Sequence, residues 1–483
     1  MRLNSSYLCL ICLHIICCYT TGNNYIKDNT LQAFSGRIVY PTSSTYDQDR
    51  ISFNKKIDAK PAIIFFCNDS EDIKIAINYA KSVRKPIRVR SNRHSYEGFS
   101  IADDAVVIDI SGITTIELNH DKTTVKVGAG NDLYNVYKKL WEEHLTIPGG
   151  SCPTVGIAGF TLGGGIGFSS RLMGLAADNV VAFELITANA QFLTINEQQY
   201  SDLFWACRGA GNGNFGVIVS LTFKTHQVNN NLSIYKIEWD WDQLYHISNS
   251  WFRIRETAPD TLMMFLRFQK QEGQKSIFSF GQYFGSMIEL KKILEPLLQF
   301  PAKNILVKEL NYMEAVDFWA GIPHRIHATS YREDSNKQRQ AFKATSLYLR
   351  QPFSRQALEV IDKYYTQNDI KNNYTIIDSY GGQINKVAEN FNAFPHRGTI
   401  ASVQILAYWQ NDIEKNVQLE WSRRYYCALE QFGEGGAYSN YPDIWLKDWA
   451  TKYYGNNLHR LKQIKRKYDP HNLFHYEQSI PVE

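Results

Sequence analysis

The sequence predicts an α+β protein made of two domains. Over residues 60–225, short strand-like runs alternate with helix-like runs around a segment rich in glycine. From residue 229 to about 432 glycine becomes less frequent, and longer extended stretches alternate with helical runs. That second pattern is typical of an antiparallel sheet covered by helices on one face. We therefore expect a first domain at residues 25–228, a second at 229–432, and a C-terminal segment, 433–483, that packs back on the first domain.

Each element of the first domain has its own signal. One helix is expected to be capped by Ser70 and a second to run from Asp132, each with apolar residues at helical spacing. The two apolar stripes are Ile73, Ala76, Ile77 and Ala80, then Leu133, Val136, Tyr137 and Leu140. Clusters of β-branched residues predict strands at 87–90, 106–110, 123–127, 180–188, 192–195 and 217–223.

The second domain and the tail follow the same logic. Extended stretches at 262–268, 276–284, 345–349 and 402–409 predict strands of the antiparallel sheet. A terminal helix is expected where Leu458, Leu461, Ile464 and Tyr468 recur at helical spacing.

Composition limits the classes of partner. The 483 residues carry a net charge of only +4, with 44% hydrophobic and 21% charged residues. A nucleic-acid binder usually gathers Lys and Arg on one face. The densest basic run, Lys462 to Lys467, is interpreted as the solvated side of the terminal helix. We expect no nucleic-acid partner.

The N-terminus predicts secretion. Arg2 precedes an apolar run from Tyr7 to Tyr19, which is too short to span a bilayer and is typical of a signal peptide, here residues 1–21. A retained membrane anchor is the alternative. No other segment approaches a membrane span, so we expect an extracellular protein with no membrane partner.

Removal of that signal leaves four cysteines, at Cys67, Cys152, Cys207 and Cys427. Four in a chain this long do not form a disulfide scaffold, although two of Cys67, Cys207 and Cys427 could pair. Sequons at Asn68, Asn231 and Asn373 fit glycosylation in the secretory pathway.

Several cofactor classes are excluded by context. The run from Gly211 to Gly216 matches G-x-G-x-x-G, but a helix-like run precedes it and a strand follows, which is the reverse of a dinucleotide fingerprint. There is no phosphate-binding loop, and the histidines lack metal-ligand spacing, so no metal site is expected. A cysteine protease would need a histidine base beside its nucleophile, and the segment gives no sign of one.

The glycine-dense segment from Pro148 to Phe168 contains Cys152. Glycines let a backbone approach a ligand closely, because they have no Cβ. A cysteine exposed on such a loop is positioned to react with the ligand.

Four stretches together resemble the berberine-bridge-enzyme-like family of FAD-linked oxidases. They are YKKLWEEHLTIPGGSCPTVGIAGFTLGGGIG, ADNVVAFELITANAQFLTI, LFWACRGAGNGNFGVIVSLTF and KYDPHNLFHYEQSIP, and the similarity covers nearly the whole chain after the signal. The resemblance implies a PCMH-type FAD-binding domain at residues 25–228 and a substrate domain at 229–432. Plant members of the family carry a histidine where this chain has Phe160. The segment around Phe160 therefore resembles the microbial carbohydrate oxidases more closely.

The same resemblance implies an FAD joined to the chain by two bonds. His94, in RVRSNRHSYEG, matches the histidine bonded to the 8α-methyl group, and Cys152 matches the cysteine bonded to C6. Relatives usually have two glycines before that histidine, where this chain has Asn92 and Arg93. Either the loop is shaped differently, or Arg93 contributes charge to the pyrophosphate. The expected cofactor-binding residues are His94, Cys152, Arg90, Ser91, Asn92, Arg93, Ser95, Pro153, Thr154, Val155, Gly156, Gly159, Gly163, Gly164, Gly165, Gly167, Val217, Tyr438 and Asn440.

The catalytic residues implied by the family are Tyr441 and Gln404. Tyr441, in AYSNYPD, would be the base; an unperturbed tyrosine has a pKa of about 10 and needs help to serve at neutral pH. Gln404, in SVQILAYW, would lie near the flavin ring, and Ser402 stands where relatives often have a lysine. Val155 occupies the position whose small side chain accompanies oxidases, so O2 is the expected electron acceptor.

These expectations combine into one function. The chain is expected to be a secreted, monomeric FAD-dependent oxidase that takes a hydride from an alcohol or hemiacetal carbon and makes H2O2. C1 of an aldose or oligosaccharide, oxidised to the lactone, is the favoured substrate, with Trp319, Tyr312, Tyr408 and Trp409 as candidates for stacking on sugar rings. The alternatives are an aromatic, alkaloid or terpenoid alcohol, a dehydrogenase that ignores oxygen, and a flavin-binding defence or allergen-like protein without turnover.

Overall fold

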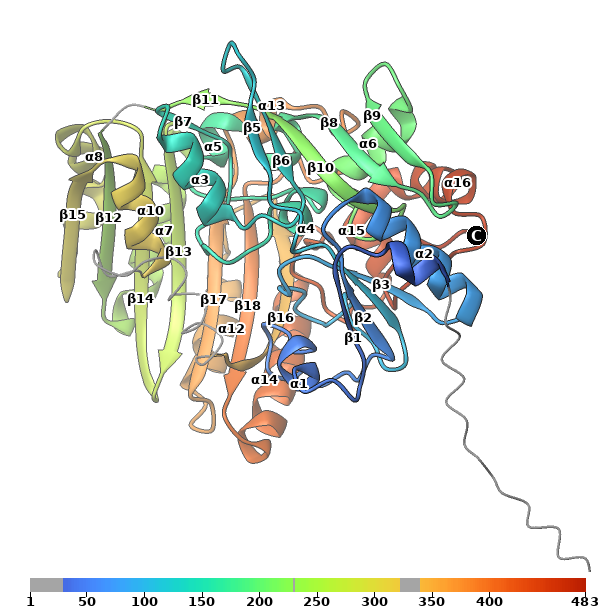
Figure 1. The fold of residues 1–483 in the computed structure, drawn as a ribbon. Coiled ribbons are helices and arrows are strands. Elements are labelled where there is room, and N and C mark those ends of the chain that lie inside the picture. Colours follow the sequence, from blue (N-terminus) through green and yellow to red (C-terminus); the bar gives the residue numbers. More distant parts are fainter. Residues whose placement is uncertain (1–28, 229–230, 322–338) are drawn as a thin grey trace, which may run out of the picture.

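A computed structural model describes residues 29–228, 231–321 and 339–483 (Figure 1). The predicted signal peptide, residues 1–21, lies outside these ranges. The first part of the chain forms a four-stranded sheet in which β4 pairs in parallel with β2 and β3. A five-stranded antiparallel sheet follows. In spatial order the strands are β1 (Arg37–Val39), β2 (Ile63–Phe66), β4 (Val106–Asp109) and β3 (Ile87–Arg90), then β5 (Ile116–Leu118), β6 (Thr124–Gly128), β10 (Val217–Lys224), β8 (Val180–Ile186) and β9 (Phe192–Asn196), with a short pair β11 (His226–Gln227) and β7 (Leu145–Thr146).

The two helices predicted in this part begin close to the predicted positions, as α2 and α3 of the helices found here. The helices found here are η1 (Asn29–Ala33), α1 (Tyr46–Asp49), α2 (Ser70–Val83), α3 (Leu133–Trp141), α4 (Ile157–Leu162), α5 (Ser170–Met173), η2 (Ala176–Asn179) and α6 (Ser201–Ala210). The Asp132 carboxylate caps α3 by accepting from the Asn135 N–H. The prediction that Ser70 caps α2 is wrong by one residue: Asp69 is the N-cap and its carboxylate accepts from the N–H groups of Glu71 and Asp72.

The second part is the expected antiparallel sheet, with seven strands. Their spatial order is β15 (Asn304–Leu310), β12 (Leu232–Trp239), β14 (Gln274–Tyr283), β13 (Leu262–Gln271), β17 (Asn372–Ser379), β18 (Ala401–Trp409) and β16 (Ala341–Leu349). Helix α14 packs on β16 and β18, α12 packs beside α14, and α7 packs beside α12. The helices are η3 (Trp241–Gln243), α7 (Leu244–Thr257), α8 (Met287–Ile293), α9 (Glu295–Leu298), α10 (Tyr312–Ala320), α12 (Arg355–Thr366), α13 (Gln383–Lys386) and α14 (Asp412–Glu430).

The chain end returns to the first sheets, as Figure 1 shows by the position of α16 beside α6. The last elements are α15 (Trp449–Tyr454), η4 (Gly455–Asn457) and α16 (Leu458–Tyr468). The Arg88 guanidinium donates to the His475 carbonyl oxygen (2.6 Å). The basic run Lys462 to Lys467 is not wholly solvated as interpreted. The Lys465 ammonium is fully buried and donates to Asp469 (2.7 Å) and to the Asn214 carbonyl oxygen (2.7 Å).

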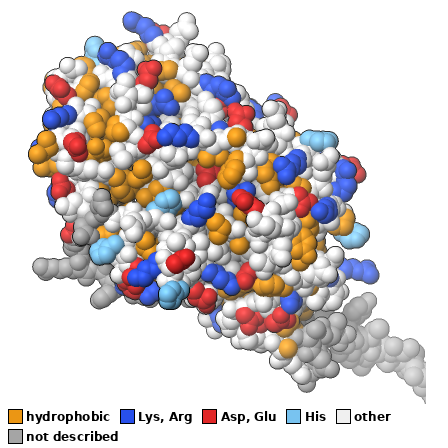
Figure 2. Space-filling model, turned by 90° about the horizontal axis from the view of Figure 1, so that it is seen from above, with side chains coloured by type: hydrophobic (Ala, Val, Ile, Leu, Met, Phe, Trp, Pro, Cys, Tyr) orange, Lys and Arg blue, Asp and Glu red, His pale blue; other side chains and the backbone are white. Residues whose placement is uncertain are grey.

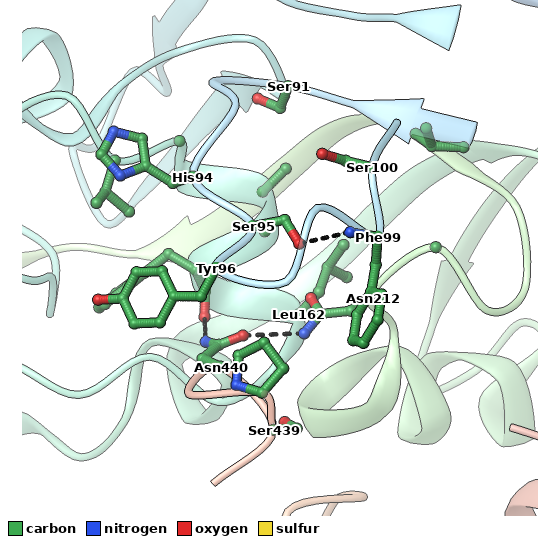
Figure 3. Close-up of a pocket in the computed structure, with 18 of the residues that line it drawn as sticks. Ser91, His94, Ser95, Tyr96, Phe99, Ser100, Leu162, Asn212, Ser439 and Asn440 are labelled. Carbon is green, nitrogen blue, oxygen red and sulfur yellow. Dashed lines mark hydrogen bonds between the residues drawn. The ribbon is translucent and has the colours of Figure 1, made fainter. Parts of the chain in front are cut away.

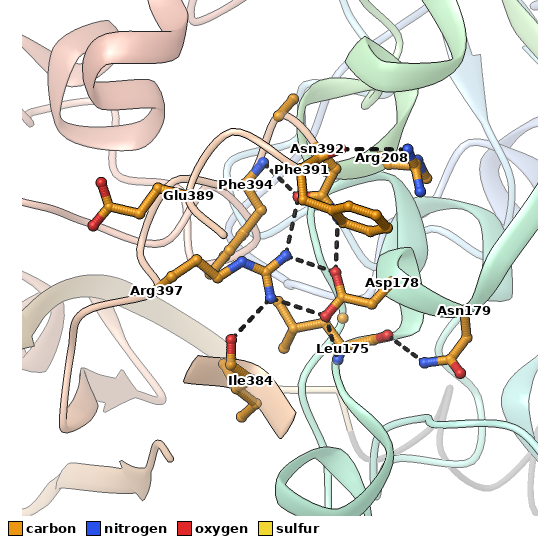
Figure 4. A network of polar contacts seen from close by, with 12 residues as sticks. Leu175, Asp178, Asn179, Arg208, Ile384, Glu389, Phe391, Asn392, Phe394 and Arg397 are labelled. Carbon is orange, nitrogen blue, oxygen red and sulfur yellow. Dashed lines mark hydrogen bonds and ion pairs between the residues drawn. The ribbon is translucent and has the colours of Figure 1, made fainter. Parts of the chain in front are cut away.

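A buried ionic network joins the two parts near η2 (Figure 4). Arg397 donates to both carboxylate oxygens of Asp178 (2.8 and 2.6 Å) and to Asn392 Oδ1 (3.0 Å). The network fixes the loop between α13 and β18. Phe394 in this loop packs so closely on Gly164 that a Cβ there would lie 2.9 Å from the ring.

Two expectations about modification change with the structure. The Asn373 side chain is fully buried in β17 and donates to Gln418 Oε1 (2.7 Å), so this sequon is not accessible in the folded chain. Asn68 and Asn231 are exposed. Cys67, Cys152, Cys207 and Cys427 are free thiols, so the pairing considered for three of them is not found in the described part of the chain.

The surface of the folded part is mixed in character. On the face in Figure 2, acidic, basic and apolar side chains are interspersed. Among the helices of residues 29–228, 231–321 and 339–483, none is long and apolar enough to cross a bilayer.

Candidate active site

A cavity of about 410 Å³ lies between the two parts of the fold. Its walls come from the loop after β3, the loop before α4 with α4 itself, Gln404 on β18, the 438–442 loop and the C-terminal residues 474–478. Figure 3 shows the loop that carries His94, Ser95 and Tyr96 on one side and the segment of Ser439 and Asn440 on the other. The cavity is therefore assembled from segments that are far apart in the sequence.

Most residues predicted to hold the cofactor or to act in catalysis are brought together in this cavity. Those that line it are Ser91, Asn92, Arg93, His94, Ser95, Cys152, Val155, Gly156, Gly159, Gln404, Tyr438, Asn440 and Tyr441. Those outside its lining are Arg90, Pro153, Thr154, Gly163, Gly164, Gly165, Gly167 and Val217.

Thr154 connects the two residues predicted to tether the flavin. Its hydroxyl lies 3.0 Å from His94 Nε2 and 3.6 Å from Cys152 Sγ. The imidazole also stacks on Phe53, with ring centroids 4.2 Å apart. Burial raises the pKa of the Cys152 thiol. Both predicted attachment points thus face one cavity with their side chains held in place.

Arg93 adopts the left-handed backbone conformation, with φ = 69°. Glycine takes this conformation without steric cost, whereas a side chain such as Arg adopts it at the expense of local strain. Its guanidinium donates to the Gln48 carbonyl oxygen (3.4 Å) and lies 5.9 Å from the centroid of the Phe66 ring. Burial, together with the nearby Arg90 charge, lowers the pKa of Arg93 to about 10.

Arg90 has a structural position instead of a cavity-facing one. Its guanidinium donates to Asp109 (2.7 Å) and to the Asp49 carbonyl oxygen (3.0 Å), and both side chains of the Arg90–Asp109 pair are fully buried. This pair ties β3 to β4 directly before the loop that carries His94. Arg90 was expected to bind the cofactor, but it does not line the cavity, and its contacts hold the loop of His94 in place.

The glycines serve two different purposes. A Cβ at Gly163 would lie 2.2 Å from Asn440 Oδ1, and the Gly165 N–H donates to the Tyr438 hydroxyl (2.8 Å). These two glycines therefore allow the 438–441 loop to pack closely against the glycine-dense segment. By contrast, a Cβ at Gly159 would meet nothing within 4 Å, and this residue lines the cavity. Only part of the glycine-dense segment thus leaves room for a ligand.

Asn440 locks that loop onto α4 and α6. Its side-chain amide donates to the Phe160 carbonyl oxygen (2.9 Å) and accepts from Asn212 Nδ2 (2.9 Å), as Figure 3 shows. Tyr441 follows directly, and its ring lies parallel to that of Tyr96, with centroids 6.1 Å apart and an interplanar angle of 3°.

Asp378, which the sequence analysis did not single out, lies next to Tyr441 at the end of β17. The carboxyl is fully buried; burial raises the pKa of Asp378 to about 8, and the Tyr441 hydroxyl opposes that rise. Burial and the Asp378 charge raise the pKa of Tyr441 well above its usual value. Within the described residues, Asp378 Oδ2 has no hydrogen-bond partner. The available signal was a single acidic residue directly after two isoleucines in the strand NNYTIIDS.

Gln404 supplies a donor at the same end of the sheet. Its side chain is buried and lines the cavity, and its Nε2 lacks a hydrogen-bond partner in the part of the chain that is described. A buried amide without a partner carries a free-energy cost that a ligand would remove. An open glycine surface, a thiol, an imidazole and this orphaned donor around one cavity fit a flavin.

Matches to protein-family models agree with this fit. The model of the FAD binding domain matches residues 61–196, and the model described as berberine and berberine like matches residues 437–481. The fold and the site thus define an FAD-linked oxidoreductase. The expected PCMH-type FAD-binding fold with an antiparallel substrate-side sheet is confirmed.

This chain belongs to the berberine-bridge-enzyme-like family. The FAD-linked oxidoreductase YgaK of Bacillus subtilis is 34% identical, over 92% of this chain and 97% of that protein. The solved structure of BBE-like 1 from Physcomitrella patens superposes with a TM-score of 0.87 at 32% identity, covering 94% and 98% of the two chains.

The substrates named for other relatives differ. The monolignol oxidoreductase AtBBE-like 13 of Arabidopsis thaliana is 28% identical, over 94% of this chain and 89% of that protein. A solved variant of Phl p 4, described as a glucose oxidase, superposes with a TM-score of 0.81 at 27% identity, covering 92% and 96% of the two chains.

Proposed function

We propose that this chain is a secreted FAD-dependent oxidase that removes a hydride from a hydroxyl-bearing carbon of a small molecule and reduces O2 to H2O2. The observation that carries the proposal is the pair formed by Tyr441, which lines the cavity, and the buried Asp378 beside it. Above the pKa of Asp378 the pair has lost one proton, and the phenol and the carboxyl can share the proton that remains. Such a pair is suited to accept the proton of a substrate hydroxyl.

FAD, when bound, would supply the acceptor for the hydride. The residues that would hold it are Cys152 and His94, whose side chains meet around Thr154, and the open backbone at Gly159. We propose that Cys152 forms the 6-S-cysteinyl bond and His94 the 8α-histidyl bond. The left-handed turn at Arg93 supports the second bond, because it gives this loop the conformation that a glycine would take.

Orientation of the substrate falls to the side chains around the pair. Gln404 Nε2 can donate a hydrogen bond into the cavity, and Tyr96 presents its ring parallel to Tyr441. Val155, which lines the cavity beside Cys152, leaves space for O2 by its small size.

An aldose or oligosaccharide oxidised at C1 to the lactone is the proposed substrate. The name of the Phl p 4 variant as a glucose oxidase supports this class. Two of the aromatics considered for stacking are not available: Tyr312 is buried and shares a hydrogen bond with Thr146 (2.6 Å), and Trp409 is buried in β18. Trp319 and Tyr408 are only partly buried and remain candidates.

An aromatic or other apolar alcohol is the second candidate, and one surface favours it. Phe168 stacks on Trp319 (centroids 4.3 Å apart) and meets Phe265 edge to face (4.9 Å), and all three are only partly buried. Phe265 packs on the same buried cluster as Tyr441. The monolignol oxidoreductase among the relatives fits this class.

A substrate panel read in two ways tests the proposal. The purified holoprotein is mixed with glucose, cellobiose, a longer oligosaccharide and a phenolic allyl alcohol, and H2O2 release is followed in air. The same additions without oxygen are followed by bleaching of flavin absorbance. If a compound bleaches the flavin without oxygen and releases H2O2 in air, the protein is an oxidase of that compound. If it bleaches the flavin but releases no H2O2, the protein is a dehydrogenase. No bleaching with any hydroxyl compound would overturn turnover of alcohols.

A further inference from the structure

A cluster of four charged side chains lies directly behind the two parallel tyrosines. At its centre is Lys343 on β16, whose side chain is 1% exposed. The Lys343 ammonium pairs with Glu97 and with Asp443 Oδ1 (2.5 Å), and the second oxygen of Glu97 accepts from Lys56 (2.8 Å). The cluster thus balances two cations against two anions.

The two carboxylates belong to the segments that carry the tyrosines. Glu97 follows Tyr96 directly, and Asp443 stands two residues after Tyr441. One ammonium group therefore joins the loop after β3 to the loop after α14. An ammonium has three donors, which allows it to bind both carboxylates at once. In a water-poor interior such attractions are stronger than at the surface.

Further contacts hold Asp443 in place. The Trp445 N–H donates to Asp443 Oδ1 (2.9 Å), and the Trp445 ring lies 4.5 Å from Lys343 Nζ. Gln478, which lines the cavity, donates to the Asp443 carbonyl oxygen (2.7 Å). The position of Asp443 is thus linked to the cavity wall as well as to Lys343.

A second buried polar group ties β16 to Tyr96. Asn54 donates to the carbonyl oxygens of Tyr96 and Phe342, both at 2.9 Å, and accepts from the Phe342 N–H (3.1 Å). Phe342 in turn meets the Tyr96 ring edge to face at 4.9 Å. Strand β16 therefore supports Tyr96 through Asn54 and Phe342. The same strand contacts the loop of Tyr441 through the ion pair of Lys343 and Asp443.

We propose that Lys343 is a positioning residue that sets Tyr441 relative to Tyr96 by binding Asp443 and Glu97 together. The inference rests on the proposed role of Tyr441 as the proton acceptor. Lys343 itself lines no part of the cavity wall, so it acts through the two carboxylates and not by touching the substrate.

The first test replaces Lys343 by Met and by Arg. Lys343→Met keeps the stem of the side chain and removes the charge, and Lys343→Arg restores a cation. The matched control is Lys270→Met, since Lys270 is also buried in the same sheet and donates to the Gln367 carbonyl oxygen, away from the tyrosines. Because Lys343→Met leaves Asp443 buried without a cation and can fail to fold, a charge-balanced double variant, Lys343→Met with Asp443→Asn, is made in parallel.

Two readouts separate positioning from stability. The first is the 19F NMR signal of 3-fluorotyrosine placed at position 441 of the full chain. The second is the rate of flavin reduction at saturating substrate, together with KM. In Lys343→Met or the double variant we expect a shifted or broadened 19F signal and a rate about 10- to 100-fold lower, because misplacement of a reacting group by about 1 Å has this effect. Lys343→Arg should recover part of both, and Lys270→Met should change neither.

A native 19F signal and a native rate in the folded Lys343→Met protein or in the double variant would overturn the inference. Failure of the proposed function has a different signature. If Tyr441→Phe keeps the normal rate of flavin reduction while Lys343→Met still shifts the 19F signal, the positioning stands and the role of Tyr441 as base is wrong.

Discussion

Asp378 in β17 and Tyr441 in the C-terminal segment lie next to each other, as a buried carboxyl beside a partly buried phenol. Asp378 is at the end of β17, opposite Ser402 on β18, and Tyr441 lies on the loop that Asn440 fastens to α4. Burial raises the pKa of both groups. At neutral pH the pair therefore keeps both protons, and it loses the first as the pH passes about 8; this titration is a property of the pair.

Replacement of Tyr441 by Phe should slow flavin reduction by roughly 10²- to 10⁴-fold, the usual contribution of a positioned general base. The measurement is stopped-flow bleaching of the flavin without oxygen at saturating substrate. Tyr348→Phe is the control, because it removes the hydroxyl of another tyrosine of the site region, one that is fully buried and whose hydroxyl meets Tyr380 (3.3 Å) outside the cavity. A rate in Tyr441→Phe similar to that of the control would assign the proton transfer to another group.

The rate should also depend on pH through Asp378. Since burial raises the pKa of Asp378 to about 8, the carboxyl holds its proton below that pH and gains a charge above it. The reduction rate should therefore rise as the pH passes about 8 and then level off. Asp378→Asn should remove this rise. A rise that persists unchanged in Asp378→Asn would show that another group titrates.

Stability should respond in the opposite direction. An unfolded Asp loses its proton near pH 4, whereas the folded carboxyl keeps it until about pH 8. The folded state binds more protons in this window, so its stability relative to Asp378→Asn should fall as the pH rises from about 4 to 8 and stay constant above that. Denaturant unfolding of both proteins at several pH values measures the difference.

The elements of the fold were largely predictable, because their signals are local. The β-branched runs at 180–188 and 217–223 became β8 and β10, and the apolar stripe from Leu133 to Leu140 became the buried face of α3. The misplacement of the α2 cap has a local reason too: Asp69 and Ser70 are both good N-cap residues, and only geometry selects between them.

The site was predictable only where a residue sits in a motif. His94, Cys152 and Tyr441 were identified from their motifs and meet at one cavity. Asp378 was missed because its partner is set by strand register and by a loop of the C-terminal segment. The buried Lys465 was missed for the same reason: its partners, including the Asn214 carbonyl oxygen, are distant in sequence.

Denatured holoprotein should stay yellow, because Cys152 and His94 lie on either side of Thr154 where each can bond to one flavin. Acid precipitation followed by absorbance of the pellet tests this. Peptide mass measurement should show that Cys152→Ala and His94→Ala each lose one of the two bonds to the flavin. The control is Cys207→Ala, which removes a buried thiol outside the cavity and should keep both bonds. Release of all flavin into the acid supernatant would show that neither bond forms.

Two glycines of the same segment should respond to alanine in opposite ways. At Gly163 a Cβ would overlap Asn440 Oδ1 (2.2 Å) and Asn212 Nδ2 (2.7 Å), so Gly163→Ala must displace the contact that fixes the loop of Tyr441. Such overpacking costs about 1–3 kcal/mol. We expect a lower melting temperature and a slower flavin reduction.

At Gly159 a Cβ would meet no protein atom within 4 Å, and the residue lies inside α4. Alanine there should stabilise the chain by up to about 1 kcal/mol through its higher helix propensity. The same methyl group points into space that the flavin would occupy, because Gly159 lines the cavity. Gly159→Ala should thus keep or raise the melting temperature of the flavin-free chain and lower the ratio of visible to ultraviolet absorbance after purification. If instead Gly159→Ala holds a full complement of flavin and Gly163→Ala melts like the parent protein, the assignment of Gly159 to the ligand and of Gly163 to the loop is wrong.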